Sequence, residues 1–452
     1  MLHVPQRPDE NGPIVSVFAG FFNGGARNAH TDVMIQMGHL DVPQAVITIK
    51  DEVDRGAEGF QEITNDSNYR RLLSEGFCVH SLGLKAQDKT LTEETIISMA
   101  HELTRLRPSV ILSLKEQPVE LLIKANQYLE QSGLPTFPII IALHRTDPEI
   151  QDAKALAALK ALEENPETKK YILGYLACAE SAAMAYKNAL SLENETPNRF
   201  FFVRNGIDLE LFSPASETQV DDFIKCNISG ESETIKNAPL VVIGARNNKE
   251  KNIDLFLEAA TYFLLDNPEA HVVMCGTGMV PDKLADMINN ATTGLPADLK
   301  FDIQKRIHAI GPVPREKLPR LMTAANVIAL TSPTIGEADP LVLKEAMACG
   351  AVPVSTCTGD TPQLVGLERP QDYYLDEIHV PFLAGTRGII TSQNAPDIAR
   401  AWEYAIRHRA EFSEHINSFK LEMDKQLLAE MYLGTVMRLC TVTESEYAAE
   451  PA

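Results

Sequence analysis

Several features that mark other classes of protein are missing from this sequence. Its seven cysteines are scattered and form no CxxC pair, which argues against a disulfide framework or a zinc site and favours reduced thiols. Basic residues are too few for a general nucleic-acid partner, because the net charge is −21. No apolar run approaches membrane-spanning length, and residues 1–13 lack the apolar core of a secretory signal. We therefore expect a cytoplasmic protein with no transmembrane segment.

Familiar nucleotide and metal motifs are missing as well. A glycine turn at residues 20–25 follows an apolar run at 14–19, but it has neither the GxGxxG spacing nor the Walker lysine. A strand, a glycine turn and a helix still let the backbone approach a phosphate, although a plain tight turn explains the pattern equally well. There is no DxD motif, so we expect no essential metal and no cofactor.

Apolar runs of strand length alternate with helical patterns along the chain. The strand-like runs lie at 14–19, 45–49, 109–114, 137–143, the start of 199–208, 239–244, 270–275, 307–310, 326–330 and 352–356. The helical patterns lie at 28–38, 92–107, 119–132, 169–189, 253–266, 315–325 and 394–442. This alternation favours an α/β protein with two doubly wound, Rossmann-like domains facing a cleft. A polar, acidic stretch divides them, so we expect domains at 1–216 and 238–414 with a linker at 217–237.

The most informative stretch is residues 336–350, with the sequence GEADPLVLKEAMACG. It follows the expected buried strand 326–330, and Pro340 suits the first turn of a helix. That helix is apolar nearly all round and should be buried, yet it contains Glu345, and Glu337 lies just before its start. Because a helix N-terminus binds anions, the stretch predicts a phosphate site flanked by two carboxylates.

Three further residues could complete such a site. Arg246 and Lys251 follow the expected strand 239–244, and two cations at the carboxyl edge of a parallel sheet suit a diphosphate. Glu345 could accept two hydrogen bonds from a ribose, so together these groups predict a sugar-nucleotide site. Taken alone, Arg246 or Lys251 would more often belong to a solvent-exposed loop than to a binding site. His144 also follows a strand, where open sheets bind ligands, although a lone histidine is more often structural.

The order of these features resembles the retaining glycosyltransferases of the GT4 family, glycosyl transferases group 1, which have the GT-B fold. The resemblance covers about residues 14–440 and is strongest over 239–366. The segments that carry it are the first glycine loop 23–26, His144, the runs 205–208 and 212–214, Gly244 with Arg246 and Lys251, the glycine turns 276–278 and 311–313, and the Glu337–Glu345 pair followed by 346–354.

The resemblance implies a role for each matching residue. Arg246 and Lys251 would hold and neutralise the diphosphate leaving group. Glu337 would lie beside the donor sugar, and His144 would contact that sugar near its 6-hydroxyl. The implied substrate-binding residues are Gly24, Gly25, Gly276, Gly311, Val313, Asp339, Pro340, Leu341 and Glu345. A tail helix at about 415–445 would cross back to pack on the first domain.

Two positions near the expected donor site depart from the family pattern, and Gln363 replaces a frequent acidic residue in the segment after the helix. Asp339 is anionic, close to the expected phosphate or sugar, where an apolar or aromatic residue is commoner. Asn252 stands where glycine commonly follows Lys251. Both departures concern the identity of the donor more than the reaction class.

We therefore expect a retaining glycosyltransferase that moves a sugar from a UDP- or GDP-sugar to a small-molecule, glycan or lipid-linked acceptor. One alternative is a pseudoenzyme that binds a nucleotide sugar, and another is a GT-B epimerase or phosphorylase. A dinucleotide-dependent dehydrogenase is disfavoured by the missing GxGxxG motif. The sequence leaves the donor, the acceptor and the oligomeric state open.

Overall fold

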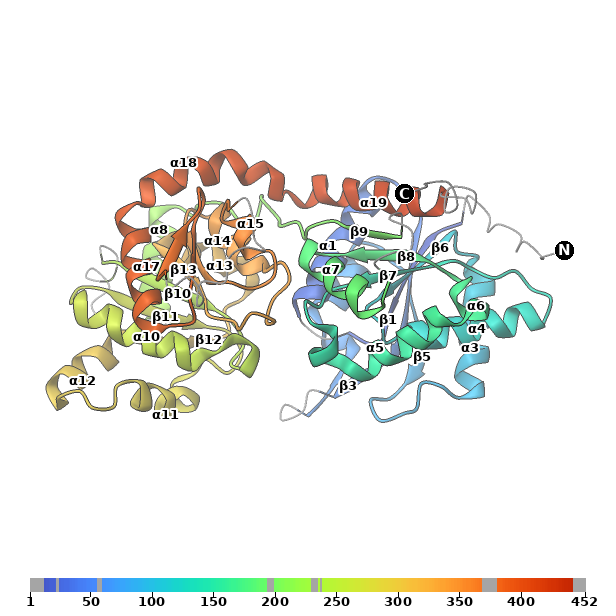
Figure 1. Cartoon of the computed structure of the whole chain (residues 1–452), viewed down its shortest axis with the longest axis horizontal. Helices are drawn as coiled ribbons and strands as arrows, with labels where there is room; N and C mark the ends of the chain where they lie inside the picture. Colours follow the sequence, from blue (N-terminus) through green and yellow to red (C-terminus); the bar gives the residue numbers. More distant parts are fainter. Residues whose placement is uncertain are drawn as a thin grey trace. The chain divides into compact units, whose positions relative to one another are not determined.

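The chain divides into two compact units, and the first is assembled from both ends of the sequence. The computed structural model describes residues 12–21, 24–54, 59–192, 199–228, 235, 238–367 and 380–441. The first unit comprises Met1–Gly206 and Lys425–Ala452, and the second comprises Ile207–Asp424. In each unit, helices cover both faces of a central sheet (Figure 1). Within the described ranges, no helix is long and apolar enough to cross a bilayer.

The first unit is built on a parallel sheet with the strand order β5-β2-β1-β6-β7-β8-β9. Its strands are β1 (Ile14–Phe18), β2 (Gln44–Lys50), β5 (Val79–Leu84), β6 (Val110–Leu114), β7 (Ile139–Leu143), β8 (Ile172–Ala177) and β9 (Phe200–Phe202). The central strands β1, β6 and β7 are buried at every residue, as expected for apolar runs covered on both faces. A separate antiparallel hairpin consists of β3 (Glu52–Asp54) and β4 (Phe60–Glu62).

Helices from both ends of the chain pack on this sheet. They are α1 (Gly25–His39), α2 (Ser67–Ser74), α3 (Glu93–Leu106), α4 (Val119–Gln131), α5 (Pro148–Glu164), α6 (Pro166–Lys169), α7 (Glu180–Ala189) and α19 (Lys425–Thr441), with the short turn η2 (Ile63–Asn65). The tail helix α19 packs against α1 and β8, as expected for this fold. It begins at Lys425 and not near 415, because Asp424 has extended backbone angles that interrupt the helix. Positions 442–445 lie outside the described residues.

One sequence-based expectation for this unit is wrong. Residues 169–189 were expected to form a single helix, but 172–177 form the strand β8, and α7 begins only at Glu180. A short apolar run is ambiguous between a strand and a buried helix, so its partners decide. Here β7 and β9 pair with β8 on either side. A Cβ at Gly174 would lie 2.6 Å from the Arg199 carbonyl oxygen, which shows how closely the neighbouring chain approaches.

The second unit repeats the doubly wound plan. Its sheet has the strand order β12-β11-β10-β13-β14-β16-β15, and only the edge strand β15 is antiparallel to its neighbour. The strands are β10 (Leu240–Gly244), β11 (His271–Cys275), β12 (Ile307–Gly311), β13 (Val327–Leu330), β14 (Val352–Thr356), β15 (Phe382–Ala384) and β16 (Ile389–Thr391).

The helices of the second unit enclose one continuous apolar core. They are α8 (Glu217–Asn227), α10 (Ile253–Asp266), α11 (Pro281–Ala291), α12 (Ala297–Lys305), α13 (Leu318–Ala324), α14 (Leu341–Ala348), α15 (Thr361–Leu364), α17 (Ala395–Arg407) and α18 (Arg409–Phe419), with the turns η3 (Lys249–Lys251), η4 (Arg315–Lys317) and η6 (Lys420–Met423). Trp402 of α17 is fully buried against Phe256 and Phe263 of α10, so it serves packing.

The stretch expected to be an interdomain linker, 217–237, begins with a packed helix. Ser216 forms a capping box at the start of α8, and this helix buries Val220, Phe223 and Ile224 in the core of the second unit. The polar residues that suggested a linker therefore include the exposed side of a helix. Positions 229–234, 236 and 237 lie outside the described residues.

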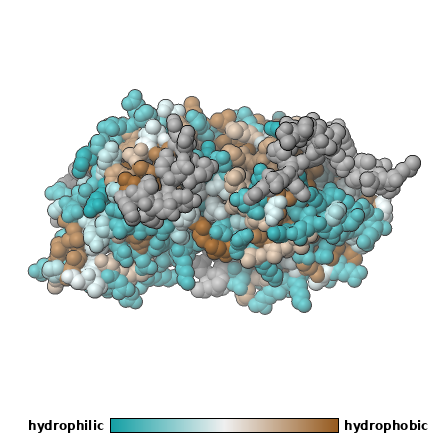
Figure 2. All heavy atoms as spheres, in the orientation of Figure 1, coloured by the Kyte–Doolittle hydropathy of each residue, from teal (hydrophilic) through white to brown (hydrophobic). Residues whose placement is uncertain are grey.

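Exposed apolar side chains are scattered over several elements. Examples with more than half of their surface exposed are Ile150, Phe301, Leu421 and Met437. On the face shown in Figure 2, apolar patches are interspersed among hydrophilic residues. Single exposed apolar residues of this kind are normal on soluble folds and indicate no particular partner.

Both sheets have a point at which the strand order reverses. The reversal lies between β1 and β6 in the first unit and between β10 and β13 in the second. In open α/β sheets, ligands bind beyond the carboxyl ends of the strands at such a switch point. The fold therefore selects, in each unit separately, the loops that should carry function.

Candidate active site

Two loops meet at the switch point of the second unit. We name residues 245–252 the cation loop and residues 331–340 the acidic loop; they follow β10 and β13 respectively. Thr331 Oγ1 donates a hydrogen bond of 3.0 Å to the main-chain carbonyl oxygen of Lys251. The Lys251 ammonium forms an ion pair with the Glu337 carboxylate. The structure thus brings together two residues that the sequence separates widely.

Two backbone features allow this close approach. Asn252 has left-handed angles, φ 47° and ψ 56°, which asparagine adopts more readily than most residues with a side chain. Asn252 can therefore replace the commoner glycine without redirecting the chain. A Cβ at Gly336 would lie 2.8 Å from the Glu250 carbonyl oxygen, so the acidic loop needs glycine where it crosses the cation loop.

The electrostatics of the cation loop favour an anionic ligand. The Lys251 side chain is only 17% exposed, and burial together with the charge of Arg246 lowers its pKa to about 8. The Glu250 carboxylate opposes this shift, because an opposite charge favours the ammonium. Arg246 is exposed, and its guanidinium makes no hydrogen bond or ion pair with any residue that the structure describes.

A buried ion pair lies at the start of α14. The Asp339 carboxylate contacts Lys344 Nζ at 2.5 Å, and the two side chains are 1% and 2% exposed. Asp339 ends the acidic loop, whereas Lys344 lies within a helix that was expected to be apolar around most of its surface. The anionic residue that departs from the family pattern is therefore neutralised by a cation of the same chain.

The first turn of α14 lies beside the cation loop. The helix begins at Leu341, one residue later than expected, with Pro340 as its N-cap. A Cβ at Gly244, the last residue of β10, would lie 3.0 Å from Val342 Cγ2. Because the first N–H groups of a helix lack intrahelical partners and lie at the positive end of its dipole, this terminus adds to the positive character of the site.

The second glutamate of the pair has a neighbour that the sequence did not suggest. Glu345 is 12% exposed, and its Oε1 atom lies 3.8 Å from the Arg315 guanidinium of η4. Arg315 also lies over the Phe212 ring, 5.5 Å from its centroid. Arg315 follows β12 at the carboxyl edge, and that position was the signal that could have identified it.

The predicted glycines lie at the ends of β11 and β12. Gly276 has φ 130°, and a Cβ there would lie 1.9 Å from the Ala245 carbonyl oxygen, so only glycine lets this turn rest on the cation loop. Its N–H donates to the Gly311 carbonyl oxygen at 2.8 Å, which fixes the two turns together. Val313 is half-buried and packs on the core of the second unit.

A turn after β14 supports the acidic loop, and sequence reasoning missed it. The Glu337 N–H donates to Thr358 Oγ1 at 3.1 Å, and the Asp360 N–H donates to the Ala338 carbonyl oxygen at 2.8 Å. A Cβ at Gly359, which has φ 50°, would lie 2.3 Å from the carbonyl oxygens of Glu337 and Ala338. The detectable signal was the TGD run directly after an apolar strand.

The remaining predicted residues belong to the first unit. Gly24 is the N-cap of α1 with an extended backbone, and a Cβ at Gly25 would meet nothing within 4 Å. These two positions therefore do not require glycine in the ligand-free chain. Asn23, part of the same predicted loop, lies outside the described residues.

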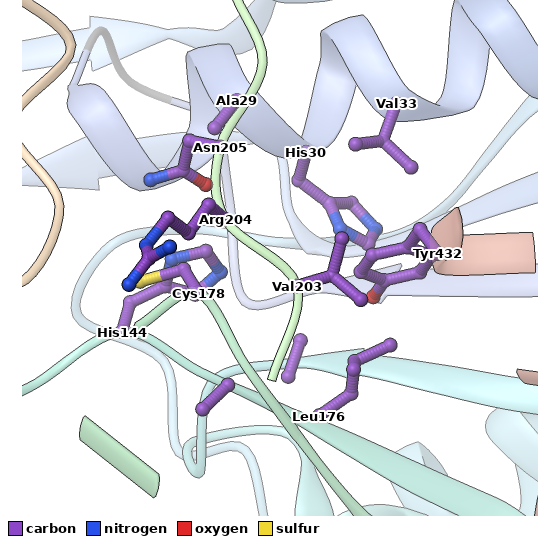
Figure 3. A pocket seen from close by; sticks show the side chains of 12 residues that line it. Ala29, His30, Val33, His144, Leu176, Cys178, Val203, Arg204, Asn205 and Tyr432 are labelled. Carbon is purple, nitrogen blue, oxygen red and sulfur yellow. The ribbon is translucent and has the colours of Figure 1, made fainter. Parts of the chain in front are cut away.

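His144 follows β7 and lines a small pocket in the first unit. Figure 3 shows His144, Cys178 and Arg204 on one side of this pocket and His30 with Tyr432 on the other. The imidazole of His144 makes no hydrogen bond with any described residue. Burial, with a smaller contribution from nearby cations, lowers its pKa well below 6.5. His144 is therefore neutral at pH 7 in the ligand-free protein.

No group of three or more His, Cys, Asp or Glu side chains within the described ranges is arranged to hold a metal ion.

Comparison with known proteins links the second unit to one family. Residues 227–370 match the family described as Glycosyl transferases group 1. The D-inositol 3-phosphate glycosyltransferase of Mycolicibacterium gilvum is 26% identical over 283 residues, covering 59% of this chain and 58% of that protein. The alpha-maltose-1-phosphate synthase of Mycolicibacterium smegmatis is 27% identical over 243 residues, covering 52% and 58%. The chain thus spans less than two thirds of the length of these relatives.

Solved structures resemble both units. Anabaena HepE in complex with UDP has a TM-score of 0.68 at 15% identity, with 94% of this chain and 99% of that chain covered. Sucrose-phosphate synthase from Thermosynechococcus elongatus has a TM-score of 0.63 at 15% identity, with 97% and 100% covered. At these identities the likeness establishes the fold.

Proposed function

We propose that this protein, which matches the glycosyl transferases group 1 family over residues 227–370 and has the GT-B fold, transfers a sugar from a nucleoside-diphosphate sugar to an acceptor hydroxyl with retention of configuration. The family resemblance and the fold, both expected from the sequence, are confirmed. The donor, the acceptor, the stereochemical course and the residue roles are parts of the proposal.

One observation carries the proposal: the cation loop, the acidic loop and the start of α14 meet at the switch point of the second unit. Arg246 is exposed without a partner among the described residues, and Lys251 is held beside it. A diphosphate would give Arg246 an anionic partner and would add to the Glu337 carboxylate that already pairs with Lys251. The helix terminus adds N–H donors for the same anion.

In this proposal the cations act on the leaving group. As the glycosidic bond breaks, negative charge develops on the departing diphosphate, and fixed positive charge stabilises that state most. Lys251 would contribute a point charge and Arg246 a planar fork of donors. Glu337 would accept hydrogen bonds from the donor sugar, and its pairing with Lys251 keeps the ammonium charged. The acceptor hydroxyl would attack on the leaving-group face and pass its proton to a phosphate oxygen.

Other residues would bind the two ends of the donor. Glu345 would accept hydrogen bonds from the ribose, and Arg315, at 3.8 Å, would hold its carboxylate in place. The Gly311 turn would face the base. His144 would contact the sugar as a neutral imidazole, which can both donate and accept a hydrogen bond. We propose a UDP-sugar as the first donor to test, because the similar Anabaena protein was crystallised with UDP and with UDP-glucose.

The test combines binding with turnover. Thermal unfolding of the full chain would be measured with UDP, GDP and ADP and their sugars, and nucleotide release would then be followed with candidate acceptors, with and without EDTA. We expect Lys251→Ala to lower kcat/KM by about 100-fold or more. Lys249→Ala, a change at an exposed lysine of the same loop, should leave it unchanged.

Each alternative gives a different result in this experiment. Near-normal turnover of the Lys251→Ala variant would contradict the proposed mechanism. A thermal shift without nucleotide release under any condition would indicate a sugar-nucleotide binding protein. Formation of a sugar phosphate from inorganic phosphate would indicate a phosphorylase. A product sugar with one stereocentre inverted and no transfer to an acceptor would indicate an epimerase.

A further inference from the structure

The first unit carries cations at its own switch point that the proposed function does not use. Lys115 follows β6, Arg145 follows β7, and Arg27 lies in the first turn of α1, which follows β1. Strands β6 and β7 are neighbours, and Leu114 pairs with Ala142. The ends of these strands therefore place Lys115 close to Arg145, and both interact electrostatically with His144. The chain as a whole carries a net charge of −21, so such a cluster needs an explanation.

Most of these cations already have a partner. Arg145 binds the Glu116 carboxylate at 2.7 Å and the Asp152 carboxylate at 2.9 Å. Arg27 donates from Nε to the Gly20 carbonyl oxygen at 3.0 Å. Lys115 is the exception, because its ammonium makes no hydrogen bond and no ion pair with a described residue.

Lys115 is also held in an unusual backbone conformation. Its φ is 67°, a left-handed value that is uncommon and strained for a residue with a side chain. Two hydrogen bonds fix this conformation: the Lys115 N–H donates to the Ala142 carbonyl oxygen at 3.0 Å, and Ser113 Oγ donates to the Lys115 carbonyl oxygen at 2.9 Å. Strained residues that the fold holds in place in this way cluster at functional sites.

A second group without a partner lies beside Lys115. His144 ends the neighbouring strand and makes no hydrogen bond with a described residue, although both ring nitrogens can take part in one. Burial and the charges of Arg27 and Arg145 lower the pKa of Lys115 to about 8, and a bound anion would reverse this shift. A compact ammonium beside an imidazole provides donors for the oxygens of a phosphate group.

We propose that Lys115 and His144, at the switch point of the first unit, bind the phosphate group of a phosphorylated acceptor. The inference rests on the proposed glycosyl transfer, because it names the class of acceptor for that reaction. Lys115 supplies the charge, and the N–H of the His144 imidazole donates a further hydrogen bond, which leaves its other nitrogen for the donor sugar. Arg27 raises the local positive potential. Glu116 binds Arg145 through Oε2, and its charge also favours the Lys115 ammonium without forming an ion pair with it.

Binding is tested with inorganic phosphate in the presence of saturating UDP, so that the second unit's site is occupied. Thermal unfolding of the wild-type chain should shift upward with phosphate beyond the shift given by chloride at equal ionic strength. Lys115→Met should abolish this extra shift, whereas Lys115→Arg should retain part of it. Lys154→Met, which removes an exposed lysine of α5, serves as the matched control and should behave as wild type.

Turnover is tested with pairs of sugars that differ only in a phosphate. We expect the wild-type protein to transfer sugar to the phosphorylated member of a pair. In the Lys115→Met variant the KM of this acceptor should rise about 10- to 100-fold, which is the effect of losing one charge-assisted contact. The KM of the donor should not change.

Three results would overturn the inference. One is an equal phosphate shift in Lys115→Met and Lys154→Met, and another is transfer that ignores the acceptor phosphate. The third is a rise in donor KM alone, which would assign Lys115 to the donor diphosphate. If the proposed function itself were wrong, UDP alone would give no shift in thermal unfolding, and this result is distinct from the three above.

Discussion

The buried pair of Asp339 and Lys344 allows a sharp test of how the acidic loop is held. The two side chains are 1% and 2% exposed and in contact at 2.5 Å. Lys344→Met would leave the Asp339 carboxylate buried without this cation. Breaking a buried ion pair in this way costs about 3–5 kcal/mol. For a domain of this size, about 2–4 °C of melting temperature corresponds to 1 kcal/mol, so we expect a decrease of about 6–20 °C.

The chain contains a built-in probe for this measurement. Trp402 is the only tryptophan, and it is fully buried in the second unit. Its fluorescence therefore reports the unfolding of the unit that contains the pair, whatever the first unit does. Thermal and urea unfolding of the full chain, followed by this signal, give the free energy of unfolding of that unit.

Two further variants separate charge from packing. In the double variant Asp339→Leu with Lys344→Met both charges are absent, so it should recover most of the lost stability. Lys283→Met removes an exposed lysine of α11 and should change stability by less than about 0.5 kcal/mol. A single variant that unfolds like wild type, or a double variant no more stable than the single, would refute this account of the pair.

Three other predictions concern the same unit. Gly359→Ala places a Cβ 2.3 Å from two carbonyl oxygens of the acidic loop, so it should lower kcat/KM at least about tenfold, whereas Gly434→Ala, in open space on α19, should not. The affinity for UDP should fall as the pH rises through about 8, because the free protein then loses the Lys251 proton that the bound anion favours; calorimetry in two buffers should detect proton uptake on binding. Glu345→Gln should weaken the binding of UDP but not of pyrophosphate, which has no ribose. Equal weakening of both ligands would contradict the proposed contact between Glu345 and the ribose.

Much of the fold followed from local patterns in the sequence. Continuous apolar runs identified the buried parallel strands, and the doubly wound plan is confirmed. Strand β8 was missed because 172–177 is too short for its periodicity to distinguish a strand from a buried helix. Its pairing with β7 and β9 settles the matter, and those partners lie more than twenty residues away on either side.

The candidate site divides in the same way. Arg246, Lys251 and Glu337 could be named from the sequence, because the loops that follow parallel strands lie at the carboxyl edge of the sheet. Glu345 could be named as a carboxylate within the apolar helix that follows one of these loops. For Thr358 and Gly359 the sequence offers only the TGD run after β14, and their contact with the acidic loop depends on β14 lying beside β13.

The sequence by itself therefore determined which chemical groups stand at the two switch points and in what order. Only the tertiary structure decided which of them neutralise one another. Asp339 looked like a misplaced anion until α14 placed Lys344 against it, and Glu116, which follows Lys115 in the sequence, pairs in the structure with Arg145. The physical reason is that pairing between charges depends on distance and burial, which are properties of the packed chain and not of the residues one at a time.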